Sequence, residues 1–372
     1  MSGRSIHESV SERTERALLV QVIMGRRGKG EAAESLSELE RLADTAGAVV
    51  VGRITQRRDR PTPALFVGEG KLSDIQLACR RAEANLIIFD NDLSAIQVNN
   101  LDISLGIKVI DRTELILQIF ARRARSAEAQ IQVELAQLQY LVSRIPISER
   151  QQRFQGGIGM RGPGESPLQL RNEPMRRQIK ALKRKLETIR KRHERTRVRR
   201  PWPLVTLIGY TNAGKSTLLN AFAPADAYVD DRLFATLDTK TRLVRLMNGR
   251  NVLMTDTVGF IRHLPHGLVA SFRSTLDVAA EADLLLIVVD SGHAAARDHL
   301  AVVRDTLAEI GAAGVPAMLL LNKCDTPAAA GALPELRCEF PGAIEISALR
   351  RTGLDGVKTA VAAFLEEKTD CV

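Results

Sequence analysis

The amino-acid sequence predicts an α/β protein with an N-terminal parallel-sheet α/β domain, an antiparallel helical hairpin and a second α/β domain. Strand-like and helix-like segments alternate before residue 112 and again from residue 204, and a heptad-like apolar pattern lies between them. A chain of 372 residues is also too long for one ordinary core. We place the domains at residues 1–111, 112–200 and 201–372.

The first domain alternates short apolar runs with helical stretches. The apolar runs are 17–23, 48–54, 86–90 and 107–111, and the helical stretches lie near 31–46, 69–84 and 94–105. This alternation favours a small parallel sheet covered by helices.

The second region has apolar residues spaced 4, 3, 4, 3 in two stretches. They are Ile131, Leu135, Leu138, Val142 and Ile145, then Met175, Ile179, Leu182, Leu186 and Ile189. Two such seams joined by a segment rich in glycine and proline predict an antiparallel hairpin. Residues 171–200 hold 14 Lys and Arg against three Glu, so the outer face of the second helix should be strongly positive.

Residues 156–164, between the two helices, hold five glycines and one proline. Such a segment ends both helices and forms a loop at the far end of the hairpin. The loop is either a flexible connector or an RNA contact in which the backbone approaches its partner closely. The predicted contact residues are Gly156, Gly157, Gly159, Arg161, Gly162 and Gly164.

Charge is unevenly distributed along the chain. Residues 1–200 carry 37 Lys and Arg against 24 Asp and Glu, whereas residues 201–372 carry 16 against 20. A basic front half favours a nucleic-acid partner, and a solvated basic surface is the alternative. No apolar run reaches the ~18 residues of a membrane span, and four scattered cysteines fit a reducing compartment. We therefore expect a cytoplasmic protein without a membrane span.

The segment GYTNAGKST stands between an apolar run and a helical stretch and matches G-x-x-x-x-G-K-[ST]. Backbone N–H groups and a helix N-terminus in such a turn surround phosphate oxygens. Lys215 is expected to contact the β- and γ-phosphates and Ser216 to bind Mg²⁺. The predicted nucleotide contacts are Gly209, Tyr210, Thr211, Asn212, Ala213, Gly214, Lys215, Ser216 and Thr217.

Three further motifs follow in the order of a GTP-binding domain. Asp256 can hold Mg²⁺ through water, and Gly259 can offer its N–H to the γ-phosphate. Asp325 can accept two hydrogen bonds that guanine donates and adenine cannot. Each motif is weak alone, but together they predict a P-loop GTPase domain that binds GTP and GDP. The residues are Asp256, Thr257, Val258 and Gly259, then Asn322, Lys323, Cys324 and Asp325, then Ser347, Ala348 and Leu349 at the base edge.

Residues 230–238, with the sequence DDRLFATLD, provide a candidate first switch, and residues 256–275 provide the second. Thr236 would reach Mg²⁺ when GTP is bound and release it after hydrolysis, so Ser216, Thr236 and Asp256 form the metal set. The other nucleotide contacts predicted in this segment are Phe234, Ala235, Leu237 and Asp238.

Phe260 stands where some GTPases have a glutamine that orients the attacking water, so a slow intrinsic rate is expected. The water must then be positioned by backbone, by a partner or by a monovalent cation. Asn212 is a candidate K⁺ ligand, or its side chain only satisfies the loop. We assign the catalytic roles to Lys215, Thr236 and Gly259.

These segments resemble the HflX family of ribosome-associated GTPases over residues 16–365. The resemblance is carried by GGIGMRGPGE, GYTNAGKSTLLNAF, LFATLD, TDTVGFIRHLPHGLVASFRSTL and NKCD, and in the front half by LFVGEGKLSDI and VIDRTELILQIFARRARSAEAQIQVELAQLQYL. It implies that the three domains act together on the large ribosomal subunit and its RNA. It also implies splitting or rescue of stalled ribosomes, with the glycine-rich loop reaching toward the peptidyl-transferase region.

The sequence departs from the family pattern after GPGE. The family continues T-Q-L-E and then Asp-Arg-Arg, whereas this chain has SPLQLRNEP. Pro167 and Pro174 are expected to shorten or re-aim the second helix of the hairpin. GEGK at residues 68–71 resembles the family's G-x-G-K, and we interpret it as a helix-opening turn rather than a second nucleotide site.

We therefore expect a monomeric GTP-hydrolysing factor whose GTP state binds the ribosome and whose hydrolysis, stimulated by the large subunit, releases it. Two alternatives stay open. One is a constitutive RNA-binding or assembly protein with a structural nucleotide domain, against which the intact Lys215, Ser216, Asp256 and Asp325 argue. The other is a GTPase for a non-ribosomal RNA.

Overall fold

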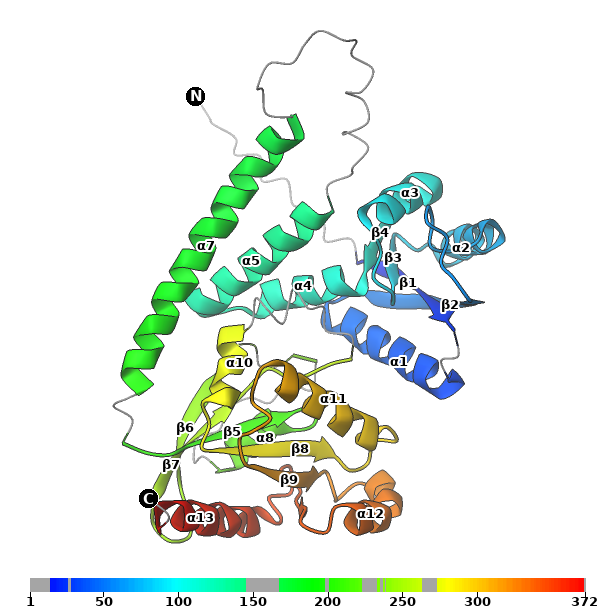
Figure 1. Cartoon of the computed structure of the whole chain (residues 1–372). Helices are drawn as coiled ribbons and strands as arrows, with labels where there is room; N and C mark the ends of the chain where they lie inside the picture. The colour runs from blue at the N-terminus through cyan, green and yellow to red at the C-terminus, as the bar shows by residue number, and fades with distance from the viewer. Residues whose placement is uncertain are drawn as a thin grey trace, which may run out of the picture. The chain divides into compact units, whose positions relative to one another are not determined.

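The computed structural model describes residues 14–25, 28–144, 167–197, 201–222, 233–234, 237, 239–262 and 273–370. The chain divides into two compact units, Met1–Ile116 and Leu117–Val372. Each unit contains one β-sheet with helices against it (Figure 1). None of the helices in the described ranges is long and apolar enough to cross a membrane.

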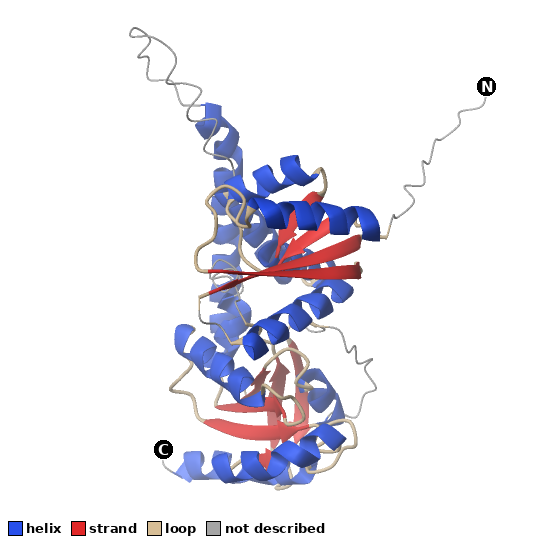
Figure 2. Cartoon of the chain, turned by 90° about the vertical axis from the view of Figure 1, so that its right-hand side faces the viewer, coloured by secondary structure: helices blue, strands red, loops and turns tan. Residues whose placement is uncertain are grey.

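The first unit has a four-stranded parallel sheet in the order β2-β1-β3-β4, with helices on both faces (Figure 2). Its elements are β1 (Arg16–Met24), α1 (Lys29–Thr45), β2 (Val49–Arg58), α2 (Glu69–Ala82), β3 (Leu86–Phe89), α3 (Ala95–Leu105) and β4 (Lys108–Asp111). This arrangement confirms the predicted parallel-sheet domain.

Strand β1 is buried on both faces, which explains its nearly continuous apolar sequence. Side chains alternate across a strand, so Leu18, Val20 and Val22 enter one core, together with Ile75 of α2 and Leu101 of α3. Fully buried residues of α1 contribute to the opposite core, where the other side chains of β1 lie; they are Leu39, Leu42 and Ala43.

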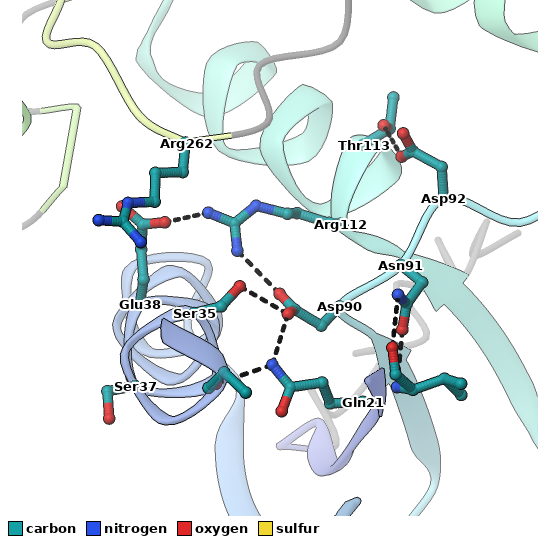
Figure 3. A network of polar contacts seen from close by, with 12 residues as sticks. Gln21, Ser35, Ser37, Glu38, Asp90, Asn91, Asp92, Arg112, Thr113 and Arg262 are labelled. Atoms are coloured by element: carbon teal, nitrogen blue, oxygen red, sulfur yellow. Dashed lines mark hydrogen bonds and ion pairs between the residues drawn. The ribbon is translucent and has the colours of Figure 1, made fainter. Parts of the chain in front are cut away.

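A buried ion network lies at the carboxyl end of this sheet (Figure 3). Arg112 pairs with Asp90, which follows β3, at 2.8 Å, and with Glu38 of α1. Ser35 and Gln21 also donate hydrogen bonds to Asp90, at 2.6 and 2.9 Å. Burial alone would raise the pKa of the Asp90 carboxyl, but the Arg112 guanidinium and these donors hold that pKa below its ordinary value.

Helix α4 (Arg112–Arg123) leads to α5 (Ala127–Ser143) and α7 (Pro167–Arg197), the two helices of the hairpin. The two lie side by side and run in opposite directions (Figure 1). Leu135 of α5 and Leu182 of α7, both from the predicted seams, are buried. Gln178 donates a hydrogen bond to Glu134 across the pair at 2.5 Å. The predicted helical hairpin is confirmed.

The expectation that Pro167 and Pro174 shorten the second helix was wrong. Helix α7 begins at Pro167 and continues through Pro174, so that it has 31 residues against 17 in α5. A proline fits a first helical position because that N–H has no partner within the helix. Pro174 removes one interior donor, and the packing of the following turns against α5 keeps the helix continuous.

The second sheet has six strands in the order β10-β9-β8-β5-β7-β6. All neighbours are parallel except β6, which is antiparallel to β7. Its elements are β5 (Leu204–Gly209), α8 (Lys215–Phe222), β6 (Lys240–Arg245), β7 (Asn251–Asp256), α10 (Arg273–Ala280), β8 (Leu284–Asp290), α11 (Ala296–Glu309), β9 (Ala317–Asn322), α12 (Pro327–Glu339), β10 (Ile344–Glu345) and α13 (Leu354–Asp370).

Two apolar clusters lie on opposite faces of this sheet. Val205 and Leu207 of β5 pack with α8 and α13, whereas Ile208 packs with α11 and α12. Strand β5 therefore lies in the middle of the core, and the loop after it is fixed by buried structure on both sides.

Strand β6 is a strand that the sequence analysis missed. It is an edge strand, and its sequence KTRLVR is largely exposed, so it lacks the apolar run that marks the other strands. The available signal was Asn248-Gly249, a turn-forming pair between two short extended segments.

Candidate nucleotide site

The motifs identified in the sequence lie at the carboxyl ends of parallel strands. The phosphate-loop segment follows β5, D-T-V-G starts at the end of β7, N-K-C-D starts at the end of β9, and S-A-L follows β10. Because these strands belong to one sheet and point the same way, the segments gather at one edge. Open α/β sheets bind their ligands at this edge.

Lys215 begins α8, and its side chain folds back over the loop that precedes it. Its ammonium donates hydrogen bonds to the carbonyl oxygens of Gly209 and Tyr210, at 3.1 and 2.9 Å. The residue is only 6% exposed, and this burial lowers the pKa of its ammonium to about 8, with the nearby Asp256 carboxylate opposing the shift. The loop thus encircles a buried cation, which is a suitable partner for phosphate.

This pKa predicts that nucleotide binding takes up a proton in alkaline solution. Above pH 8 the ammonium of the empty site is increasingly neutral, whereas bound phosphates favour its charged form. Proton uptake per GDP should therefore grow between about pH 7.5 and about pH 9, and the apparent affinity should fall by up to about tenfold per unit. Titration calorimetry in two buffers of different ionisation enthalpy measures this uptake, and identical heats in both buffers would contradict the prediction.

A hydroxyl and a carboxylate lie together beside this lysine. Ser216 donates a hydrogen bond to Asp256 at 2.6 Å, and Asp256 is fully buried. Hydroxyl and carboxylate oxygens coordinate Mg²⁺ directly or through water, so the side chains of Ser216 and Asp256 fit this ion. Thr236, the third predicted ligand, lies outside the described residues, as do Ala235 and Asp238.

Asn322 joins the phosphate loop to the S-A-L loop. Its side-chain amide donates a hydrogen bond to the Ala213 carbonyl at 2.8 Å and accepts one from the Ala348 N–H at 3.0 Å. Gly214 lies against this amide; a Cβ there would come within 2.2 Å of the Asn322 nitrogen, and its φ is +94°, so glycine is required. One buried side chain therefore fixes the spacing between the two ends of the site.

The rest of N-K-C-D shows which side chains are available to a ligand. Lys323 pairs with Asp290, at the end of β8, at 2.8 Å. The Cys324 N–H donates to the Ile346 carbonyl at 3.3 Å, which anchors this loop. Asp325 remains partly accessible, with 24% of its side chain exposed and Arg350 at 3.8 Å. Its carboxylate therefore keeps accessible surface at the edge of the sheet where the motifs gather.

The D-T-V-G-F segment lies directly against the phosphate loop. Phe260 donates a backbone hydrogen bond to Gly209 at 3.1 Å and accepts one from Thr211 at 2.8 Å. A Cβ on Gly259 would lie 2.7 Å from the Thr211 Cα and 3.0 Å from the Lys215 ammonium, so only glycine permits this approach. Thr257 and Val258, from the same motif, are buried.

Of the candidate first switch, the structure describes Leu233, Phe234 and Leu237, and all three side chains are buried. The Phe234 ring meets the Phe120 ring of α4 edge to face, with centroids 4.7 Å apart. Asn212 is exposed, and its φ of +61° is left-handed. Leu349 of the S-A-L motif is 77% exposed. The predicted RNA contacts Gly156, Gly157, Gly159, Arg161, Gly162 and Gly164 lie outside the described residues.

Sequence reasoning missed two residues that support the site. Asp290 holds Lys323, and the available signal was a carboxylate at the end of an apolar run. His299 stacks on the Tyr210 ring of the phosphate loop, with ring centroids 3.7 Å apart, and belongs to no motif that predicts such a position. Arg262, which lies in the predicted second switch, donates its backbone N–H to the Tyr210 hydroxyl at 2.9 Å.

Comparisons with known proteins match most of the chain. Families described as GTP-binding GTPase N-terminal, GTP-binding GTPase Middle Region and 50S ribosome-binding GTPase match residues 33–121, 123–200 and 204–323. The GTPase HflX of Caldanaerobacter subterraneus is 43% identical over 98% of this chain and 84% of its own length. That of Escherichia coli is 43% identical over 78% and 70%. A crystal structure of SsGBP with GDP covers 95% of this chain and 99% of its own, with a TM-score of 0.52 and 26% identity.

A phosphate loop, a D-x-x-G segment and an N-K-x-D segment at one edge of such a sheet define a P-loop GTPase. The relatives place it further: the chain belongs to the HflX family of GTPases and is a GTP-hydrolysing enzyme. This confirms the resemblance seen in the sequence.

Proposed function

We propose that this protein is a GTP-gated factor that binds the large ribosomal subunit and splits or rescues stalled ribosomes. A cationic surface on α7, in the same unit as the GTPase sheet, carries the proposal. The family name 50S ribosome-binding GTPase and the HflX relatives support the choice of partner. We propose that it acts as a cytoplasmic monomer, because one ribosomal site per protein requires no second copy.

Exposed cations dominate α7. The exposed Lys and Arg residues are Arg176, Arg177, Lys180, Lys183, Arg184, Lys185, Lys191 and Arg192. Among the described side chains of this helix, Glu173 pairs with Arg177, and Glu187 pairs with Lys191 at 3.7 Å. A row of cations held on one rigid helix suits the regularly spaced phosphates of folded RNA.

The nucleotide roles follow from the site. Lys215 and the surrounding backbone N–H groups would hold the phosphates, and Asp325 would select guanine. Ser216, Asp256 and Thr236 would hold Mg²⁺, which neutralises phosphate charge when bound. Gly259 would offer its N–H to the γ-phosphate. These residues bind and orient GTP, and the same contacts would order the two switches.

The water-positioning group is not supplied by the residue after D-x-x-G. Phe260 is only 3% exposed and packs in the core beside α11, so its side chain cannot orient a water. We propose that backbone groups, the ribosome or K⁺ supply this function, which makes the intrinsic rate slow. Asn212 is exposed at the phosphate loop, and we propose it as the K⁺ ligand.

The test is a sucrose-gradient profile of intact ribosomes with the protein and a non-hydrolysable GTP analogue, GDP or no nucleotide. We expect co-migration with the large subunit and loss of intact ribosomes only with the analogue. Equal binding in the GTP and GDP states would contradict gating. Stimulation of hydrolysis by bulk RNA as strong as that by isolated large subunits would favour a non-ribosomal RNA substrate.

A charge-reversal variant tests the α7 surface. Changing Lys180, Lys183 and Arg184 to Glu should weaken association with the large subunit by at least about tenfold and lower its salt dependence. The control reverses three exposed cations of the GTPase domain, Arg245, Arg250 and Arg304. An equal loss in both variants would show that net charge, rather than this surface, determines binding.

A further inference from the structure

The hydroxyl of Thr211, in the phosphate loop, is buried without a hydrogen-bond partner. The residue is only 7% exposed, and its Oγ1 makes no hydrogen bond to any residue that the structure describes. A buried hydroxyl without a partner is costly, because it has lost its bonds to water and gained none. Valine has almost the same shape and would fill this space without that cost. The packing of the loop therefore does not explain a threonine at this position.

Two other threonines of the same domain show the usual arrangement. Thr206 of β5 and Thr257 after β7 are 0% and 1% exposed. The Thr206 hydroxyl donates to the Val278 carbonyl at 3.4 Å. The Thr257 hydroxyl donates to the Leu207 carbonyl at 2.8 Å. Buried side-chain oxygens are normally satisfied in this way. Thr211 differs from both, so its hydroxyl is available to a bound ligand.

The loop turns at Asn212, directly after this threonine. The Asn212 backbone is left-handed, with a φ of +61°, and its side chain is exposed, whereas Thr211 and Ala213 are buried. The Lys215 ammonium donates to the Tyr210 carbonyl at 2.9 Å, and this carbonyl belongs to the peptide group that joins Tyr210 to Thr211. The buried cation therefore contacts the peptide group that leads into Thr211.

The D-T-V-G-F segment also contacts Thr211. The Thr211 N–H donates to the Phe260 carbonyl at 2.8 Å, and Phe260 directly follows Gly259 in the chain. This bond uses the backbone donor of Thr211, so the hydroxyl is the donor that it retains for a ligand. Thr211 is thus adjacent to the surroundings of both Lys215 and Gly259, the two groups assigned above to the γ-phosphate.

A γ-phosphate oxygen is the ligand atom that suits this hydroxyl. A threonine hydroxyl donates one hydrogen bond, and phosphate oxygens are strong, charged acceptors. In a phosphate loop the backbone N–H groups surround the α- and β-phosphates, which GDP shares with GTP. The Thr211 N–H is instead bonded to the segment that is assigned to the γ-phosphate. The position of Thr211 therefore favours the phosphate that only GTP has.

We propose that the Thr211 hydroxyl donates a hydrogen bond to a γ-phosphate oxygen and so helps the site to distinguish GTP from GDP. In hydrolysis the water oxygen bonds to the γ-phosphorus, the bond from that phosphorus to the β–γ bridging oxygen breaks, and GDP leaves. Thr211 keeps its proton and stabilises charge on the oxygens of the transferred group. The inference rests on the γ-phosphate roles proposed above for Lys215 and Gly259, and it does not depend on the ribosomal partner.

The test compares the affinities of fluorescent GDP and a fluorescent non-hydrolysable GTP analogue for the full chain without ribosomes. Thr211→Val removes the hydroxyl and nearly keeps the shape of the side chain. It should weaken analogue binding by about 10- to 100-fold, the effect of one lost hydrogen bond to a charged group, and leave GDP affinity within about twofold of the wild type. The kcat/KM for GTP should fall by at least the same factor, because the transition state keeps this contact.

The melting temperature of the nucleotide-free protein gives a second readout. Thr211→Val should melt at the wild-type temperature or above it, because the hydroxyl has no partner among the described residues and its removal breaks no such bond. A residue that only shapes the loop would show the opposite pattern, with lower stability and an equal loss of affinity for both nucleotides.

Two variants serve as controls. Thr211→Ser keeps the hydroxyl and should retain the wild-type ratio of analogue affinity to GDP affinity. Thr206→Val removes another buried hydroxyl of the same domain, one that is bonded to a backbone carbonyl within the fold. It should leave both the ratio and the kcat/KM for GTP at their wild-type values.

An unchanged ratio in Thr211→Val would overturn the proposal, as would an equal loss of affinity for both nucleotides. A ratio in Thr211→Ser as low as that in Thr211→Val would also overturn it, because the serine still provides a hydroxyl. Loss of nucleotide binding in Lys215→Ala together with an unchanged ratio in Thr211→Val would overturn this inference alone. A failed ribosome-gradient experiment would contradict the proposed function and leave this measurement unaffected.

Discussion

Substituting Lys215 with alanine is expected to weaken GTP and GDP binding by about 30-fold to several thousand-fold. The ammonium is buried at the centre of the phosphate loop, and truncating one partner of a buried charged contact costs about 2–5 kcal/mol. Fluorescent-nucleotide titration measures the loss. Arg304→Ala removes an exposed cation of α11 and should leave both affinities at the wild-type value.

The same variant separates the proposed function from its rival. A protein gated by GTP loses ribosome binding in the GTP state, and with it cellular function, when Lys215 is replaced. A constitutive RNA-binding protein with a structural nucleotide domain keeps both. Unchanged function of Lys215→Ala in cells, with nucleotide binding abolished in vitro, would therefore support the rival.

Arg112→Met is expected to destabilise the first unit by about 3–5 kcal/mol at neutral pH. The substitution leaves Asp90 and Glu38 buried without their cation, and an uncompensated buried charge is costly. Urea unfolding of the full chain, followed by hydrogen exchange of the β1–β4 amides, measures the effect. The control is Arg53→Met, whose ion pair with Glu40 is largely exposed and should contribute less than about 1 kcal/mol.

The destabilisation caused by Arg112→Met should become smaller as pH falls. In the wild type the pKa of Asp90 is lowered, so the stability that its charge provides is lost as pH falls through that pKa. In Arg112→Met the buried Asp90 carboxyl has lost its cation, so burial favours its protonated form and protonation stabilises the folded variant. The difference between the two proteins should therefore narrow from pH 7 to about pH 4.5. A difference that stays constant would show that lost packing, rather than buried charge, dominates.

Much of the fold could be predicted because its strands are buried on both faces. Segments such as β5 and β8 appear in the sequence as continuous apolar runs. The phosphate-loop motif begins where the run of β5 ends. Strand β6 lacks that signature, since an edge strand with charged side chains has no buried face long enough to produce it. The hairpin was predictable from its seams, whereas the passage of α7 through Pro174 depends on packing against α5.

The supporting contacts of the site could not be predicted in the same way. Motif spacing places Lys215 and Asp256 at neighbouring strand ends. It does not show that His299, far along the chain, stacks on Tyr210, or that Asp298 pairs with Arg262. Such contacts depend on the rotation of α11 on the sheet, which the sequence pattern specifies only as an apolar stripe. The buried Arg112 is a similar case, because a charged residue at the start of a helix normally predicts exposure.

The Asn322 amide, which joins Ala213 to Ala348, has a consequence for the thermodynamics of binding. That side chain is buried and hydrogen-bonded to both the phosphate loop and the S-A-L loop. These two loops therefore lose their freedom to move relative to each other when the protein folds, and not when the nucleotide binds. The entropic penalty of binding should then come mainly from the two switches. GDP and a GTP analogue share the same base, so their contacts with the base should be the same. Their binding entropies should differ, because only the analogue orders the two switches.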